Sequence, residues 1–94
     1  MPTETDFAGL PEVIHTFVEP YRAADGVLYD VSVVARQRTD RTWVGWLEFT
    51  DVNGRVLATD RETTQSSAEQ VKYWAEGLEP TYLDGALARA RRGS

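Results

Sequence analysis

The sequence contains no cysteine, and this absence excludes several kinds of site. Without thiols there is no disulfide framework, no thiolate nucleophile and no cysteine-based zinc site, and nothing indicates an oxidising compartment. Histidine is almost absent as well, because His15 is the single one in the chain. We therefore expect a cytoplasmic protein with no metal and no cofactor.

Long apolar runs are also missing. No stretch approaches the 18 or more apolar residues that read as a membrane-spanning helix. The N-terminal residues MPTETDFAGLPE carry acidic side chains where a signal peptide has a basic start and an apolar run. The sequence thus predicts a protein that is not exported and has no membrane partner.

Size and charge limit the remaining classes. A chain of 94 residues, 41% of them apolar, is the size of one small domain. Such a domain buries about 60 to 65% of the surface of its unfolded chain, which leaves little room for a deep enzyme cleft. The net charge is −5, from 10 basic and 15 acidic residues, and this balance argues against a nucleic-acid partner. We expect a protein that is not an enzyme.

Two parts of the chain differ in composition. Residues 1–11 mix acidic and small side chains with two prolines, which predicts a flexible N-terminal arm. Residues 12–92 are predicted to form a single α+β domain. Its first segment, from Glu12 to Tyr21, is rich in β-branched and aromatic residues and contains Pro20, so a strand is favoured. Apolar spacings of three and four leave a helix open there.

The middle of the chain has the two-residue period of β-strands. The predicted strands are residues 27–37, 42–50 and 55–62. Asp51-Val52-Asn53-Gly54 is typical of a hairpin turn, and a four-residue loop would place Phe49 opposite Val56. Consecutive hairpins of this kind predict an antiparallel meander.

The period then changes to that of helices. Either Ser66 or Ser67 can cap the first helix, and Ser66 with Glu69 matches a capping box. Gly77 is a plausible end, and Pro80 suits the first turn of a second helix. Two apolar stripes follow this spacing: Val71, Trp74, Ala75 and Leu78, then Leu83, Ala86, Leu87 and Ala90. The predicted fold class is α+β, a three- or four-stranded antiparallel β-meander followed by two C-terminal helices packed on one face.

The strand at residues 42–50 is apolar on both faces, since Trp43 and Trp46 lie on opposite sides of it. A strand of this kind needs covering on both sides, and the helix pair covers only one. We therefore predict a contact surface for a protein partner or a second copy, with one tryptophan at its centre. Trp43 and Trp46 are the candidate apolar anchors, and Arg61 and Glu62 the candidate polar edge. The alternative is that both tryptophans are ordinary core and rim residues.

Two other kinds of site stay open. Asp60 and Glu62 lie two residues apart on a predicted strand, so their side chains would share a face. A small-ligand site or a hydrolase could therefore be centred on Asp60, Arg61 and Glu62, together with His15. The same segment could simply connect a strand to a helix.

The C-terminal arginines Arg89, Arg91 and Arg92 could bind phosphates, although no lysine cluster like that of double-stranded-RNA-binding domains accompanies them.

Three stretches carry a family resemblance: Trp43-Val-Gly-Trp-Leu-Glu-Phe, Arg61-Glu-Thr-Thr-Gln and Tyr73-Trp-Ala-Glu-Gly-Leu-Glu-Pro-Thr-Tyr-Leu-Asp-Gly-Ala-Leu. Together they resemble a group of small uncharacterised bacterial proteins, over roughly residues 13–90. The resemblance implies a bacterial cytoplasmic protein and transfers no catalytic residue. In the order of its elements alone, the chain is also similar to antitoxins of the HicB type.

Overall fold

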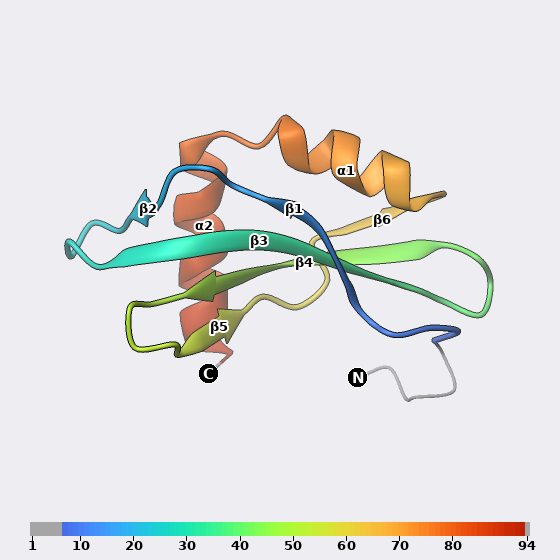
Figure 1. Cartoon of the computed structure of the whole chain (residues 1–94), viewed down its shortest axis with the longest axis horizontal. Helices are drawn as coiled ribbons and strands as arrows, with labels where there is room; N and C mark the ends of the chain where they lie inside the picture. Colours follow the sequence, from blue (N-terminus) through green and yellow to red (C-terminus); the bar gives the residue numbers. More distant parts are fainter. Residues whose placement is uncertain (1–6, 94) are drawn as a thin grey trace.

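The computed structural model describes residues 7–93, which form one layer of antiparallel sheet with two helices on one of its faces (Figure 1). The elements are β1 (Glu12–Thr16), β2 (Tyr21–Arg22), β3 (Leu28–Gln37), β4 (Trp43–Thr50), β5 (Val56–Ala58), β6 (Thr63–Gln65), α1 (Ala68–Glu76) and α2 (Pro80–Arg92). This arrangement confirms the predicted α+β class. The segment at 12–22, where the sequence favoured a strand, contains two strands.

The sheet is a four-stranded meander whose two outer strands are each broken into two pieces. β1 and β2 both pair with β3, and β5 and β6 both pair with β4. Pro20 lies at the break between β1 and β2, where its missing N–H cannot contribute to a ladder. The second break separates β5 from β6 at residues 59–62, so the predicted strand at 55–62 is not continuous.

The hairpin between β4 and β5 differs from the expected one by one residue. Phe49 pairs with Leu57 rather than with the residue before it, so the predicted register is wrong. The backbone N–H of Asp51 donates to the Arg55 carbonyl at 3.0 Å, and Gly54 has a φ of +82°. These features belong to a type I turn followed by a glycine bulge, and the bulge adds the extra residue. Leu57 therefore faces the core beside Phe49.

The two helices begin and end at the residues that cap them. Ser67 is the N-cap of α1, and its hydroxyl accepts a hydrogen bond from the backbone N–H of Gln70 at 3.1 Å. This outcome selects Ser67 over Ser66, so the capping box proposed for Ser66 does not form. Gly77 ends α1, and Pro80 is the first residue of α2, as expected.

The core lies between the sheet and the helices. Its members from the strands include Val31, Val33, Leu47 and Phe49, and those from the helices are Val71, Ala75, Leu83, Ala86, Leu87 and Ala90. Both predicted helical stripes thus face the sheet, with Trp74 and Leu78 packed at the margin. Within residues 7–93, neither helix has the length and apolar character needed to cross a bilayer.

The predicted arm at residues 1–11 lies partly outside the described residues. From residue 7 onward the chain runs beside the end of β3, where the N–H of Ala8 donates to the Gln37 carbonyl at 2.9 Å. The Arg36 guanidinium lies over the Phe7 ring, 4.5 Å from its centroid. Phe7 is therefore held at the end of the sheet face that the helices leave open.

Candidate functional site

The site is built on the sheet face that carries no helix. Side chains alternate between the two faces of a strand, so the even-numbered residues of β3 and β4 point away from α1 and α2. Trp46 of β4 pairs with Val34 of β3 at the middle of this face. Val34 and Val44 are buried without any helix above them. We call this surface the helix-free face and define it by the even-numbered positions of β3 and β4.

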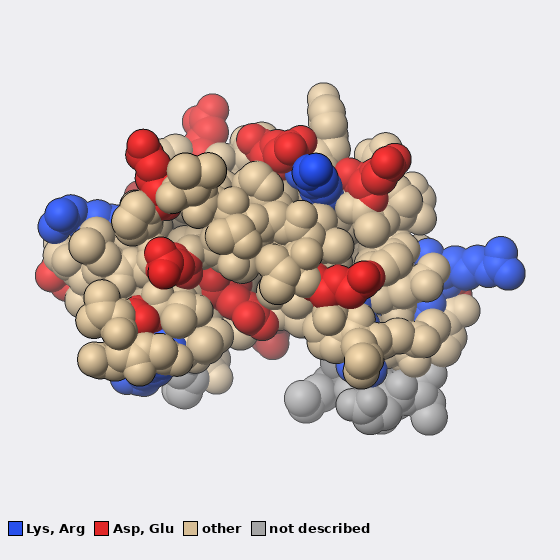
Figure 2. Space-filling model, in the orientation of Figure 1, with Lys and Arg blue, Asp and Glu red and all other residues tan. Residues whose placement is uncertain are grey.

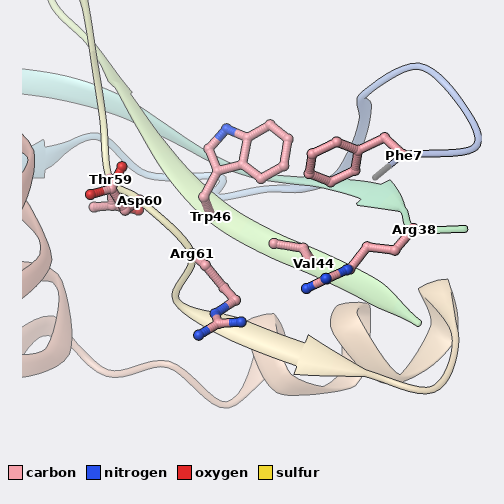
Figure 3. Close-up of a pocket in the computed structure, with 7 residues that line it drawn as sticks. All are labelled: Phe7, Arg38, Val44, Trp46, Thr59, Asp60 and Arg61. Carbon is pink, nitrogen blue, oxygen red and sulfur yellow. The ribbon is translucent and has the colours of Figure 1, made fainter. Parts of the chain in front are cut away.

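An open hollow of about 680 Å³ lies at one end of this face (Figure 3). Its lining residues are Phe7, Arg38, Val44, Trp46, Thr59, Asp60 and Arg61. In Figure 3 the Trp46 and Phe7 rings lie next to each other, Arg38 extends toward Val44, and the Arg61 side chain extends away from Trp46. The volume is within the range of small-molecule sites, about 300 to 1,000 Å³, and the hollow is partly open to solvent. Its shape suits an inserted side chain better than an enclosed ligand.

The groups that line the hollow combine an aromatic surface with free positive charge. The indole Nε1 of Trp46 donates to Glu48 Oε2 at 3.1 Å, which fixes the ring orientation. Within residues 7–93, the guanidinium groups of Arg38 and Arg61 form no ion pair with a carboxylate. Asp60 is exposed beside them. The hollow can therefore accept a partly anionic group next to an apolar one.

The structure separates the two candidate tryptophans. Trp43 faces the helices, where it is half-buried against the core, and Trp46 lies on the helix-free face. Trp43 thus belongs to the packing of the domain. Among the candidate anchors, Trp46 alone lies on the helix-free face.

Glu62 is also separated from the hollow, because it turns toward α2. Its side chain is only 6% exposed and accepts hydrogen bonds from Tyr82 Oη at 2.5 Å and from Arg89 Nε and Nη2 at 3.0 and 2.6 Å. Burial would raise the pKa of Glu62, but the hydrogen bonds from Arg89 and Tyr82 outweigh it and hold the pKa below its usual value. This cluster fastens the connection between β5 and β6 onto α2. Glu62 is therefore not at the polar edge beside Arg61.

The carboxylates predicted to share a face do not. Asp60 lines the hollow and Glu62 contacts α2, because residues 59–62 lie between β5 and β6 and do not keep the strand alternation. His15 is on β1 at the opposite edge of the sheet, where its ring meets Phe17 edge-on at 4.9 Å. The described residues include no cluster of three or more possible metal ligands. The constellation expected for a hydrolase is thus not assembled.

The C-terminal arginines are largely used within the domain. Arg89 is paired with Glu62, and Arg91 donates to Asp25 Oδ2 at 3.0 Å and to Tyr29 Oη at 3.1 Å. Arg92 is exposed at the end of α2. On the side shown in Figure 2, acidic side chains are interspersed with the basic ones and no continuous basic surface is visible.

Sequence reasoning missed three residues that matter here. Phe7 and Arg38 line the hollow, and Tyr82 holds Glu62. Phe7 had a signal, because it is the single aromatic residue among residues 1–11. Arg38 and Tyr82 had none, since their roles depend on which distant elements pack beside them.

Comparison with known proteins gives no match to this chain, whether with protein-family models, with curated proteins or with solved structures.

Proposed function

We propose that this chain is a non-catalytic protein-binding module and that the helix-free face is its binding surface. The observation that carries the proposal is the position of Trp46, at the middle of a sheet face that has no helix over it. Tryptophan and arginine are the residue types that most often dominate binding energy at protein interfaces. Trp46 would be the central anchor, with Arg38 and Arg61 beside it.

The apolar groups around Trp46 support this proposal. Val34 and Val44 form a buried floor beside it, and Val13 and Val56, at the two edges of the same face, are 64% and 49% exposed. An apolar patch on one face of a sheet loses contact with water when a partner covers it, and that burial favours association.

The guanidinium groups beside Trp46 also support the proposed binding surface. Arg38 and Arg61 have no ion pair within the described part of the chain, so each guanidinium can pair with a carboxylate supplied by a partner. A guanidinium binds a carboxylate through two parallel hydrogen bonds, which adds orientation to the contact. By contrast, Asp60, Glu62 and His15 are dispersed over the fold, and this gives the small-ligand or hydrolase alternative less support.

The cell compartment is part of the same proposal. We place the module in the bacterial cytoplasm, on the absence of cysteine and on the resemblance to small bacterial proteins. Nucleic acid is the less favoured partner, because Arg89 and Arg91 are already paired with carboxylates of the domain.

Site-specific photocrosslinking tests the binding surface. A photoreactive amino acid replaces Ala58, an exposed residue of β5 that is paired with Glu48 on the helix-free face. The matched control position is Tyr73 on α1, which is 77% exposed. We expect a defined covalent adduct from position 58 in cells and none from position 73.

Two further variants test whether the adduct depends on Trp46. Trp46→Ala should abolish the adduct at position 58, and Trp46→Phe, which keeps an aromatic ring, should retain most of it. Circular dichroism confirms that both variants are folded. No adduct at position 58, or equal adducts at positions 58 and 73, would overturn the proposal.

A further inference from the structure

Resting on that proposed function, we propose that the partner is a second copy of this chain. The two copies pack through their helix-free faces about a two-fold axis that lies between the two sheets. The axis runs across the strands, through the row that contains Val34 of β3 and Trp46 of β4.

The charge pattern along β3 is the first argument. Asp30 lies four residues before Val34 in β3, and Arg38, four residues after Val34, directly follows β3 and lines the hollow on the same face of the sheet. At about 3.3 Å per residue, each charge is about 13 Å from Val34. One end of the face therefore carries a carboxylate and the other end a guanidinium, at equal distances from its middle.

A two-fold axis through that middle brings opposite charges together. In an isologous interface, if one residue contacts a second, the second contacts the first across the axis. Rotation about the row of Val34 and Trp46 places Arg38 of each copy over Asp30 of the other, and each pair occurs twice. The same rotation places Trp46 against Trp46, so the two aromatic anchors meet at the centre.

Both charges are available for this contact. Asp30 is exposed, and neither Asp30 nor Arg38 forms an ion pair within residues 7–93. The carboxylate of Glu48 lies nearer the axis and accepts the hydrogen bond from Trp46. Asp30 of β3 and Arg38, the residue after β3, are thus the charges that the rotation makes complementary.

The area of the face limits the surface that the dimer can bury. Four strands about 4.8 Å apart and about eight residues long cover roughly 20 by 25 Å, or about 500 Å² per copy. The total of about 1,000 Å² is at the low end for specific complexes. We therefore expect a dimer whose population depends on concentration. Paired sheets of this kind stack about 10 Å apart, a gap that tryptophan and arginine side chains can span.

Sedimentation velocity over a concentration series tests the inference with charge reversals. The wild type should change from monomer to dimer as its concentration rises. Arg38→Asp and Asp30→Arg each create two repulsive contacts, and each should raise the dimer dissociation constant at least tenfold. The double variant, Arg38→Asp with Asp30→Arg, should return to within about threefold of the wild type.

Mixing the two single variants gives a second readout. One variant carries aspartate at both positions and the other carries arginine at both, so the heterodimer has two attractive pairs. The mixture should form dimers at concentrations where each variant alone is a monomer. Arg38→Gln, a milder change, serves if Arg38→Asp does not fold.

Matched controls separate local contacts from net charge. Lys72→Asp and Glu76→Arg on α1 change the net charge as Arg38→Asp and Asp30→Arg do, and both positions are exposed away from the sheet face. These two control variants should leave the dimer dissociation constant within about twofold of the wild-type value. Equal effects at α1, or no recovery in the double variant, would overturn the proposed register.

A monomeric wild type at every concentration would overturn the second copy as partner. The crosslink from position 58 then separates the two proposals. An adduct with the mass of a different protein leaves the binding surface in place with another occupant, and the absence of any adduct removes the binding surface as well. If deleting residues 1–6 converts a monomeric wild type into a dimer, that segment is the occupant.

Discussion

The carboxylate of Glu62 faces the guanidinium of Arg89, 27 residues further along the chain, through hydrogen bonds of 3.0 and 2.6 Å. A third hydrogen bond reaches Glu62 from the hydroxyl of Tyr82. Glu62 directly precedes β6, while Tyr82 and Arg89 belong to α2. The cluster therefore ties the edge of the sheet to the C-terminal helix.

Glu62→Gln should lower the free energy of unfolding by about 1 to 2 kcal/mol, because it keeps the shape of the side chain but removes its charge-assisted hydrogen bonds. Denaturant unfolding followed by circular dichroism measures the change. Glu19→Gln, at an exposed loop position, is the control and should leave the midpoint unchanged. Equal midpoints for Glu62→Gln and the wild type would show that the cluster does not stabilise the fold.

The same cluster makes a prediction in acid. The pKa of Glu62 is held below its usual value of 4.5, so as the pH falls the unfolded state takes up a proton before the folded state does. The stabilisation is present above that usual value and is lost as the pH falls through the folded pKa. The difference in unfolding free energy between the wild type and Glu62→Gln should therefore shrink in acid. A difference that stays constant down to pH values well below the usual pKa of a glutamate would contradict the assignment.

Tyr82 predicts a loss of stability at alkaline pH. Burial first, and then the hydrogen bond to Glu62, raises the pKa of the Tyr82 hydroxyl from 10.0 to about 12. A raised folded pKa contributes stability that is present below pH 10 and is lost as the pH rises toward 12. Tyr82→Phe should reduce this alkaline loss of stability. Spectrophotometric titration of tyrosinate should then show one fewer tyrosine with a raised pKa. Tyr21, whose pKa is also raised to about 12, should continue to titrate late in that variant.

Gly45 predicts a steric limit where β4 meets β6 and α1. A Cβ at this position would lie 3.0 Å from the Cγ2 of Thr63 and 3.1 Å from the Cγ1 of Val71. Gly45→Ala should lower the free energy of unfolding by about 1 to 3 kcal/mol through overpacking. Gly9→Ala is the matched control, because nothing lies within 4 Å of its Cβ position. A variant as stable as the control would mean that the neighbouring side chains move aside.

The start of α1 offers a comparison between adjacent residues. Ser67→Ala removes the hydroxyl that accepts the Gln70 N–H and should cost about 1 kcal/mol. Ser66→Ala changes an exposed residue that does not cap the helix, and it should stay within about 0.5 kcal/mol of the wild type. Thermal unfolding of the two variants is the measurement, and a larger loss for Ser66→Ala would show that the cap is misassigned.

Much of the fold could be predicted because local patterns determine it. The alternation in β3 gave the two faces of the strand, and the positions of Pro80 and Gly77 gave the limits of the helices. The register after β4 could not be predicted in the same way. It depends on whether the chain reverses direction with a bulge at Gly54, and a bulge shifts every later pair by one residue.

The candidate site was predicted in part. Alternation places Trp43 and Trp46 on opposite faces whatever the tertiary structure, so the sequence determined that one of them faces away from the helices. Which one does so depends on the side where α1 and α2 pack. Asp60 and Glu62 were misplaced because alternation holds only within a continuous strand, and theirs is interrupted between β5 and β6.

The sequence by itself determined the class of the fold, the two helical stripes and the existence of a strand that is apolar on both sides. These properties follow from the spacing of residues along the chain, and spacing survives any arrangement of the elements. Only the tertiary structure decided that Glu62 turns to Arg89, that Arg38 and Phe7 join Trp46, and that the helices leave the Trp46 side open. Each of these contacts joins residues from distant elements, so it depends on how the elements pack and not on any local preference.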